Sequence, residues 1–355
     1  MTRCERLMAE LKKRGLDAAL IHRSENMRYL TNGYTGEGCV FIREGEVYII
    51  TDFRYVEQAS RQAPHCKVVS TAAKHPEKDC VLELTDAHAI KAMAVETDFI
   101  SHDDFETLRR HLPFVKLESL AGIPEELRLV KDEDEIESIR AAASIACRAF
   151  ENILEKIHPG MTEKQVQILL DFEMLNLGSE GNAFDTVSAS GANGSLPHAI
   201  PSDRVIQTGE LLTLDFGAKK NGYCSDMTRT VGFGKVSAEL KEMYNLVYDA
   251  HMAALQAVKP GMTGGDLDKI ARDMLDARYP GAFGHSLGHG VGLFIHEQPR
   301  VSSGSGFVLQ CGHVITIEPG VYIPGLGGCR IEDMAILTSD GYIDPITSPK
   351  QLIEL

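Results

Sequence analysis

The sequence contains one structural pattern twice, and this repeat constrains the fold more than any other feature. The segment HPGMTEKQVQILL at residues 158–170 recurs as KPGMTGGDLDKIA at residues 259–271. In each copy Pro-Gly ends one helix, and the threonine that follows, Thr162 or Thr263, is suited to cap the next helix. The repeat therefore predicts a duplicated unit that begins with a pair of helices.

The match extends into strand-like segments that carry acidic residues. TGELLTLDFG aligns with CGHVITIEPG, so Asp215 and Glu318 fall at equivalent positions 103 residues apart. Downstream, Asp226 and Glu332 are equivalent at a separation of 106 residues, because the second copy has a longer glycine-rich turn. Each copy of the predicted helix–helix–hairpin unit thus supplies two carboxylates.

The first hairpin, LLTLDFGAKKNGYCSDMT, indicates what these carboxylates require. With Lys220-Asn221 as the two-residue turn, Asp215 lies opposite Asp226, and with the commoner Asn221-Gly222 turn it lies opposite Thr228. In both registers the two Asp side chains project from the same face of the hairpin. Carboxylates this close repel each other unless a proton or a cation lies between them.

A glycine-rich segment supplies a nitrogen donor. FGHSLGHGVGLFIHEQP contains His285, His289 and His296. Its glycines disfavour a helix, so His289 is predicted on an extended strand, and His285 is expected to have a supporting role. Four carboxylates with one imidazole suit Mn²⁺, Co²⁺ or Fe²⁺ better than structural zinc. Four negative charges exceed the charge of one divalent ion, which favours two ions, about 3.5–4 Å apart as in other two-metal sites.

Length, charge and cysteines bound the organisation of the chain. A length of 355 residues predicts two domains, and the polar connector AGIPEELRLVKDEDE separates an α/β domain at 1–125 from a second domain at 130–355. The formal net charge of −15 argues against nucleic acid and membrane surfaces as partners. Eight scattered cysteines and the absence of an apolar leader predict a cytoplasmic protein with reduced thiols.

Four segments resemble the metallopeptidases of the pita-bread fold, family M24, which include methionine aminopeptidase, aminopeptidase P and prolidase. They are LDFGAKKNGYCSDMTRT, GHGVGLFIHEQP, ITIEPGVY and RIED. The resemblance extends over essentially the whole chain. It implies an α+β fold: a pita-bread catalytic domain with internal duplication, preceded by a smaller α/β domain like that of creatinase. It also implies a homodimer in which the N-terminal domain forms part of the active-site wall.

The resemblance implies two divalent metal ions in each subunit. The implied ligands are Asp215, Asp226, His289, Glu318 and Glu332. Asp226 and Glu332 are expected to bridge the ions, with Asp215 on the first ion and His289 and Glu318 on the second. Mn²⁺ is the expected metal, with Co²⁺, Fe²⁺ or Zn²⁺ as alternatives.

Three residues are expected to take part in the reaction beside the metals. His198, in SGANGSLPHAIPSD, and His296, seven residues after His289, match substrate-side and catalytic positions of the family. A histidine such as His296 would stabilise the oxyanion as it forms. Glu318 is placed to carry a proton from the attacking water to the leaving nitrogen.

Other residues are candidates for support or for substrate contact. Arg330 shares a strand face with Glu332 and is expected to hold the metal carboxylates in place. Arg300 is a candidate to bind a substrate carboxylate, with a plain loop position as the alternative. Phe184 and Tyr223 are candidates to line a pocket for a proline ring, with ordinary core packing as the alternative.

The sequence thus predicts an Xaa-Pro dipeptidase (prolidase) that acts on proline-containing dipeptides or short peptides. The first alternative is an Xaa-Pro aminopeptidase that acts on longer peptides. Two others are a non-peptide amidohydrolase of the same fold, similar to ectoine hydrolase, and a binding protein that has lost catalysis. The complete set of five ligands disfavours the last of these.

Overall fold

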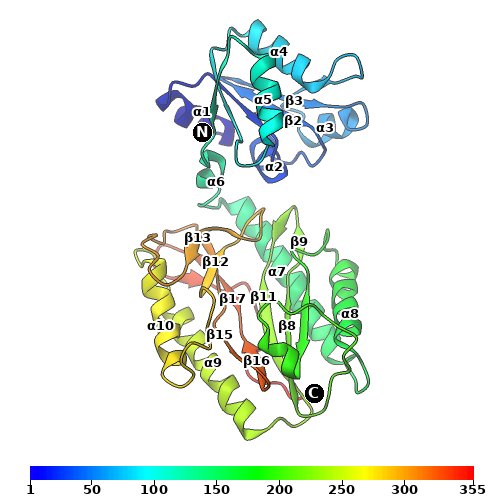
Figure 1. Ribbon diagram of the computed structural model, residues 1–355, viewed down its shortest axis with the longest axis vertical. Helices are drawn as coiled ribbons and strands as arrows, with labels where there is room; N and C mark the ends of the chain where they lie inside the picture. The colour runs from blue at the N-terminus through cyan, green and yellow to red at the C-terminus, as the bar shows by residue number, and fades with distance from the viewer. The chain divides into compact units, whose positions relative to one another are not determined.

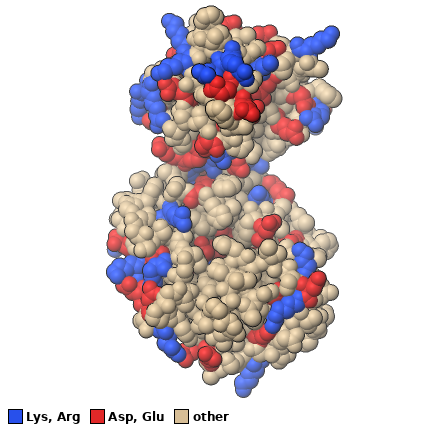
Figure 2. Space-filling view, viewed as in Figure 1, with Lys and Arg blue, Asp and Glu red and all other residues tan.

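The computed structural model describes residues 1–355 as two compact units, Met1–Arg128 (the N-terminal unit) and Leu129–Leu355 (the C-terminal unit) (Figure 1). Each unit buries its own apolar core. On the face seen in Figure 2, acidic and basic side chains alternate over the N-terminal unit, and those of the C-terminal unit leave a broad uncharged area. No helix combines the length and apolar character needed to cross a bilayer.

The N-terminal unit is a six-stranded mixed sheet in the order β4-β3-β2-β1-β5-β6. Its strands are β1 Ala18–Ile21, β2 Cys39–Arg43, β3 Glu46–Thr51, β4 Lys67–Ser70, β5 Ala92–Val95 and β6 Lys116–Ser119. Its helices are α1 Arg3–Lys13, α2 Ser24–Thr31, α3 Val56–Gln62, α4 Glu77–Ala87, α5 His102–His111 and α6 Ile123–Leu127. The central strand β1 is buried along its whole length, as its run of apolar residues predicts. Glu44-Gly45 forms the turn between β2 and β3, because Arg43 pairs with Glu46.

The C-terminal unit contains two larger sheets, β11-β8-β7 and β13-β12-β14-β17-β18. Its helices are α7 Glu133–Leu154, α8 Glu163–Asn176, the short 3₁₀ helix η1 Gly191–Ser195, α9 Ala238–Ala257 and α10 Gly264–Asp276. The strands of the first half are β7 Val187–Ser190, β8 Glu210–Phe216, β9 Lys219–Lys220, β10 Tyr223–Cys224 and β11 Met227–Phe233. Those of the second half are β12 Gly288–Gly290, β13 Glu297–Val301, β14 Val314–Ile317, β15 Gly320–Ile323, β16 Gly327–Arg330, β17 Asp333–Leu337 and β18 Tyr342–Ile343.

The predicted duplication is visible in the element order of this unit. Helices α7 and α8 precede the hairpin β8–β11, and α9 and α10 precede its counterpart β14–β17, with the two helix pairs on opposite sides of the strands (Figure 1). Thr162 and Thr263 cap α8 and α10, as the repeat predicts. A single bridge between Thr228 and Glu332 joins the two sheets. The acidic ends of both copies therefore meet at one place.

The structure selects one of the two hairpin registers. Asp215 pairs with Thr228, and the turn is Asn221-Gly222. Both turn residues have positive φ, 49° and 76°. This backbone matches the twist of a two-residue hairpin, and Asn and Gly adopt it most readily.

Helix α7 begins earlier than its apolar pattern suggests. The sequence predicts a helix from Ile136 to about Ile157, whereas the helix spans Glu133–Leu154. Asp132 accepts a hydrogen bond from the backbone of Glu135, whose side chain accepts one from the backbone of Asp132. This reciprocal cap fixes the start of the helix in a polar stretch where periodicity gives no signal.

A buried ionic cluster supports β11 and β17, the strands that directly follow Asp226 and Glu332. The Arg229 guanidinium lies 2.6 Å from Asp333, and His251 contacts the other oxygen of the same carboxylate, also at 2.6 Å. Burial alone would raise the pKa of Asp333, but Arg229, His251 and Lys350 together outweigh it and hold the pKa at about 2. Arg229 also donates to the backbone oxygen of Glu332. The cluster thereby connects β11 to Glu332 and to the start of β17.

Candidate metal centre

The four acids of the repeat lie at the strand ends where the two sheets meet. Asp215 is in β8 and Glu318 directly follows β14, whereas Asp226 and Glu332 directly precede β11 and β17. All four line one cavity of about 590 Å³, together with His289. The structure therefore brings the five predicted ligand residues together.

Close backbone contacts position His289 on strand β12. A Cβ atom at Gly288 would lie 2.0 Å from the backbone oxygen of Thr316, and one at Gly290 would lie 2.1 Å from that of Gln298. Only glycine fits at either position, which explains why His289 lies between two glycines.

The ring of His289 is oriented as in metal-binding histidines. Its Nδ1 lies 3.0 Å from the backbone oxygen of Gly290 and donates to it. This leaves the lone pair of Nε2 free, 3.5 Å from Asp226 and 3.6 Å from Glu318. A hydrogen bond at one ring nitrogen commonly fixes the other as the ligand atom. Burial also lowers the pKa of His289 to about 4, which keeps the ring neutral.

The four carboxylates that line this cavity favour the binding of cations. Burial, together with the charges of neighbouring carboxylates, raises the pKa values of Asp226 and Glu332 well above the ordinary range. Burial and the charge of Asp215 raise the pKa of Glu318 to about 8. One oxygen of Asp215, Oδ1, is buried without a hydrogen-bond partner. Donor atoms of Asp226, His289 and Glu332 lie within 4.8 Å of one another. An oxygen-rich donor set with unbalanced negative charge fits divalent ions.

Arg330 and Thr228 connect the carboxylates of Asp215 and Glu332 through hydrogen bonds. Arg330 donates to Asp215 at 2.6 Å and to the hydroxyl of Thr228 at 3.1 Å. Thr228 in turn donates to Glu332 at 2.7 Å. Arg330 also donates to the hydroxyl of Tyr322, which lies 2.9 Å from His285. The guanidinium thus fixes two of the acids, and His285 stands in its hydrogen-bond network.

Of the residues considered for substrate contact, Phe184, His198 and His296 line the cavity. The His296 ring meets that of His289 edge-on, with centroids 4.6 Å apart, and burial lowers the pKa of His296.

The other two candidates for substrate contact, Tyr223 and Arg300, do not line this cavity, and their role in substrate binding stays a prediction. Tyr223 is 7% exposed and its hydroxyl donates to Glu135 at 2.9 Å, so the side chain is part of the packing against α7. Arg300 is exposed on strand β13, so it does not occupy the plain loop position given as the alternative.

The structure adds a buried acid, Glu163, which sequence reasoning missed. Its carboxylate accepts hydrogen bonds from the backbone and hydroxyl of Ser190, at 2.7 and 2.8 Å, and from Asn193 at 2.9 Å. It also accepts from the backbone and hydroxyl of Ser202, at 3.2 and 2.7 Å. Glu163 therefore fastens both ends of the segment that carries His198.

One signal in the sequence could have indicated Glu163. It occupies the first position of α8, where the second copy of the repeat has Gly264 at the start of α10. Because the two copies differ at this position, Glu163 serves a purpose that the duplicated fold itself does not require. Lys164 and Gln167, which follow on the same helix, also line the cavity.

Comparisons with known proteins agree with this architecture. Residues 137–339 match the model of metallopeptidase family M24, and residues 3–130 match the creatinase/prolidase N-terminal domain. An Xaa-Pro dipeptidase from Pyrococcus horikoshii is 34% identical over 95% of this chain and 94% of its own.

Two solved structures are similar over nearly all of both chains. An Xaa-Pro dipeptidase from Bacillus anthracis has 40% identity and a TM-score of 0.95, with 99% of each chain covered. An X-Pro aminopeptidase from Thermotoga maritima has 36% identity and a TM-score of 0.92, with 99% of this chain and 100% of that chain covered. The chain therefore belongs to metallopeptidase family M24: it is a metal-dependent peptidase in which a creatinase-type N-terminal domain is followed along the chain by a pita-bread catalytic domain.

Proposed function

We propose that the protein is an Xaa-Pro dipeptidase that hydrolyses the bond before proline with two divalent ions. The observation that carries the proposal is the meeting of five metal-type donors in one cavity of about 590 Å³. Relatives that are similar over nearly their whole length are named Xaa-Pro dipeptidase and X-Pro aminopeptidase. Both names refer to cleavage of the bond before proline. An Xaa-Pro aminopeptidase is therefore the alternative to the proposed dipeptidase.

Within this proposal, Asp226 and Glu332 would hold both ions. Asp215 would complete the first site, and His289 and Glu318 would complete the second. Mn²⁺ fits this oxygen-rich set best, with Co²⁺ as a close alternative. When bound, such ions lower the pKa of a coordinated water and polarise the scissile carbonyl.

The protein's own residues supply orientation and proton transfer. Glu318 is proposed to accept a proton from the attacking water and to deliver it to the leaving nitrogen. His296 faces the same cavity and is proposed to donate to the oxygen of the scissile carbonyl. His198 is proposed to hold the substrate from the opposite side, and Phe184 to offer an apolar surface to the proline ring.

The decisive experiment compares two substrates with metal-stripped and reloaded enzyme. Chelator-treated protein should be inactive, and Mn²⁺ or Co²⁺ should restore cleavage of an Xaa-Pro dipeptide. Faster cleavage of the dipeptide than of an Xaa-Pro-Yaa peptide supports the dipeptidase, and the reverse supports the aminopeptidase. A dipeptide without proline serves as the control. If the metal-loaded enzyme cleaves neither proline substrate, the proposed specificity is wrong.

A second prediction concerns Glu163, which fastens the segment that carries His198. Replacing Glu163 by Gln removes the charge to which two backbone N–H groups and two hydroxyls donate. We expect kcat/KM to fall by up to about 100-fold through misplacement of His198, with metal content unchanged. Steady-state kinetics and metal analysis measure both quantities.

The matched control for this variant is Glu173→Gln on the same helix. Glu173 is also buried, but its partners are Asn152 and Lys156, outside the cavity. It should leave kcat/KM near the wild-type value. Equal losses in the two variants would show that Glu163 acts only through the stability of α8.

A further inference from the structure

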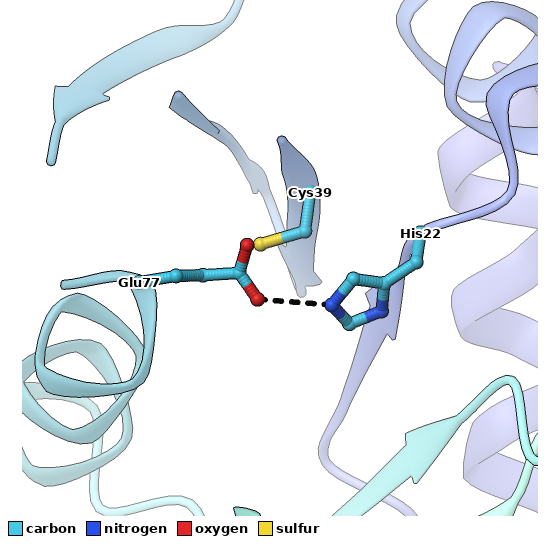
Figure 3. A group of neighbouring side chains, drawn as sticks. All are labelled: His22, Cys39 and Glu77. Atoms are coloured by element: carbon cyan, nitrogen blue, oxygen red, sulfur yellow. Dashed lines mark hydrogen bonds and ion pairs between the residues drawn. The ribbon is translucent and has the colours of Figure 1, made fainter. Parts of the chain in front are cut away.

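The N-terminal unit contains a separate group of metal-type donors. His22 directly follows β1, Cys39 begins β2 and Glu77 begins α4. Figure 3 shows the three side chains pointing toward one another from these three elements. One donor atom from each lies within 4.8 Å of the other two. Residues far apart in the sequence thus converge on a single point.

Two of the three side chains contact each other directly, and the group is partly open to solvent. Nε2 of His22 lies 3.0 Å from Oε1 of Glu77 (Figure 3). The Cys39 side chain is wholly buried, and its thiol lies beside the Glu77 carboxylate (Figure 3). Glu77 keeps 41% of its side chain exposed and His22 keeps 20%, so solvent reaches the group from one side.

We propose that His22, Cys39 and Glu77 form a binding site for Zn²⁺ or a similar thiolate-binding divalent ion, with water as the fourth ligand. Sulfur, imidazole and carboxylate are the donors that zinc takes in tetrahedral sites. With bonds of about 2.0–2.3 Å, such a site separates its ligand atoms by about 3.3–3.6 Å. The His22–Glu77 separation of 3.0 Å and the 4.8 Å limit on all three donor atoms bracket that range.

Charge balance also favours a divalent ion at this point. Burial, together with the charge of Glu77, raises the pKa of Cys39 well above its ordinary value, so the thiol keeps its proton. A divalent ion would take the place of that proton, and one thiolate with one carboxylate would then neutralise it. The proton is released to solvent and no bond is oxidised or reduced.

This donor set differs in kind from that of the catalytic cavity. The catalytic donors are four carboxylates and one imidazole, with no thiol. A thiolate selects zinc-like ions, whereas oxygen-rich sites suit Mn²⁺. An ion at the N-terminal site would join β1, β2 and α4, and binding only to the folded state would stabilise that unit.

Titration of the full-length, metal-free protein with Co²⁺ tests the site. Only a thiolate ligand gives the near-ultraviolet sulfur-to-cobalt charge-transfer band, so the catalytic ions do not contribute to it. The wild type should show this band, and Zn²⁺ should displace it. Cys39→Ser should lose the band and bind one Co²⁺ fewer per chain, while metal-restored peptidase activity stays near wild type.

Further variants separate the proposed ligands from their neighbours. Glu77→Gln keeps the thiol and should weaken Co²⁺ binding at this site at least tenfold. Cys66→Ser is the matched control, because Cys66 is a partly buried thiol of the same unit outside the group, and it should keep the band.

Three results would overturn the proposal. The first is no charge-transfer band in the folded wild type with excess Co²⁺. The second is a band that persists in Cys39→Ser. The third is a band that depends on Cys80, which follows Glu77 by one helical turn, and not on Cys39. Circular dichroism on each variant verifies that the protein tested is folded.

Discussion

Replacing Asp226 by Asn should abolish metal retention and peptidase activity while making the metal-free protein more stable. Asp226 is the carboxylate proposed to bridge both ions, and an amide of the same shape carries no charge for them. Metal ions supply several kcal/mol of transition-state stabilisation, so a loss on the order of 100- to 1,000-fold or more in kcat/KM is expected. Metal analysis after gel filtration and assays in Mn²⁺ measure the two losses.

The rise in stability follows from the charges around Asp226. Burial and the charges of Asp215 and Glu318 disfavour its ionised form. Asn removes that repulsion, so thermal unfolding in chelator should occur at a higher temperature than in the wild type. Mn²⁺ should raise the wild-type midpoint by preferential binding to the folded state and leave that of the variant nearly unchanged.

The matched control for Asp226→Asn is Asp185→Asn. Asp185 lines the same cavity but is exposed and stands outside the ligand set. It should retain both ions, most of the activity and the wild-type response to Mn²⁺. An active Asp226→Asn variant with two ions per chain would refute the bridging role.

The residues whose positions the sequence predicted correctly belong to short, recognisable sequence motifs. The repeat aligned the acids, and the parity of strands put Arg330 on the face of Glu332, where the structure has it contacting Asp215. Asn221-Gly222 carried the stronger turn signal of the two registers, and the structure adopts it. The turn and the strand parity are each read within a few residues, and the acids are recognised because one short motif occurs twice.

The residues that were missed or misplaced depend on contacts distant in sequence. The bond from Ser190 to Glu163 spans 27 residues, and that from Tyr223 to Glu135 spans 88. No periodicity links such pairs. The donor group at His22 is a further case, because Cys39 and Glu77 lie on different elements that only the folded sheet brings together.

In metal-free protein, stability should fall as the pH rises from about 5 to about 8. The pKa of Glu318 is about 8 in the folded state, against an ordinary value of 4.5, and those of Asp226 and Glu332 are raised as well. The folded state therefore binds these protons more tightly than the unfolded state. The contribution of Glu318 to stability is complete below about pH 4.5 and is lost as the pH rises through about 8, and Asp226 and Glu332 act in the same direction. Asp333, with a pKa of about 2, acts in the opposite direction only below this window.

Urea unfolding at several pH values, in chelator and in Mn²⁺, measures this dependence. In chelator the free energy of unfolding should fall by a few kcal/mol across the window. In Mn²⁺ the fall should vanish or reverse, because ions replace the protons and bind more tightly as the carboxylates ionise. Glu318→Gln should flatten the slope in chelator, since its amide does not titrate. If metal-free stability instead rises with pH over this range, the carboxylates are not held together in the folded apoprotein, and the charge argument for the metal centre fails.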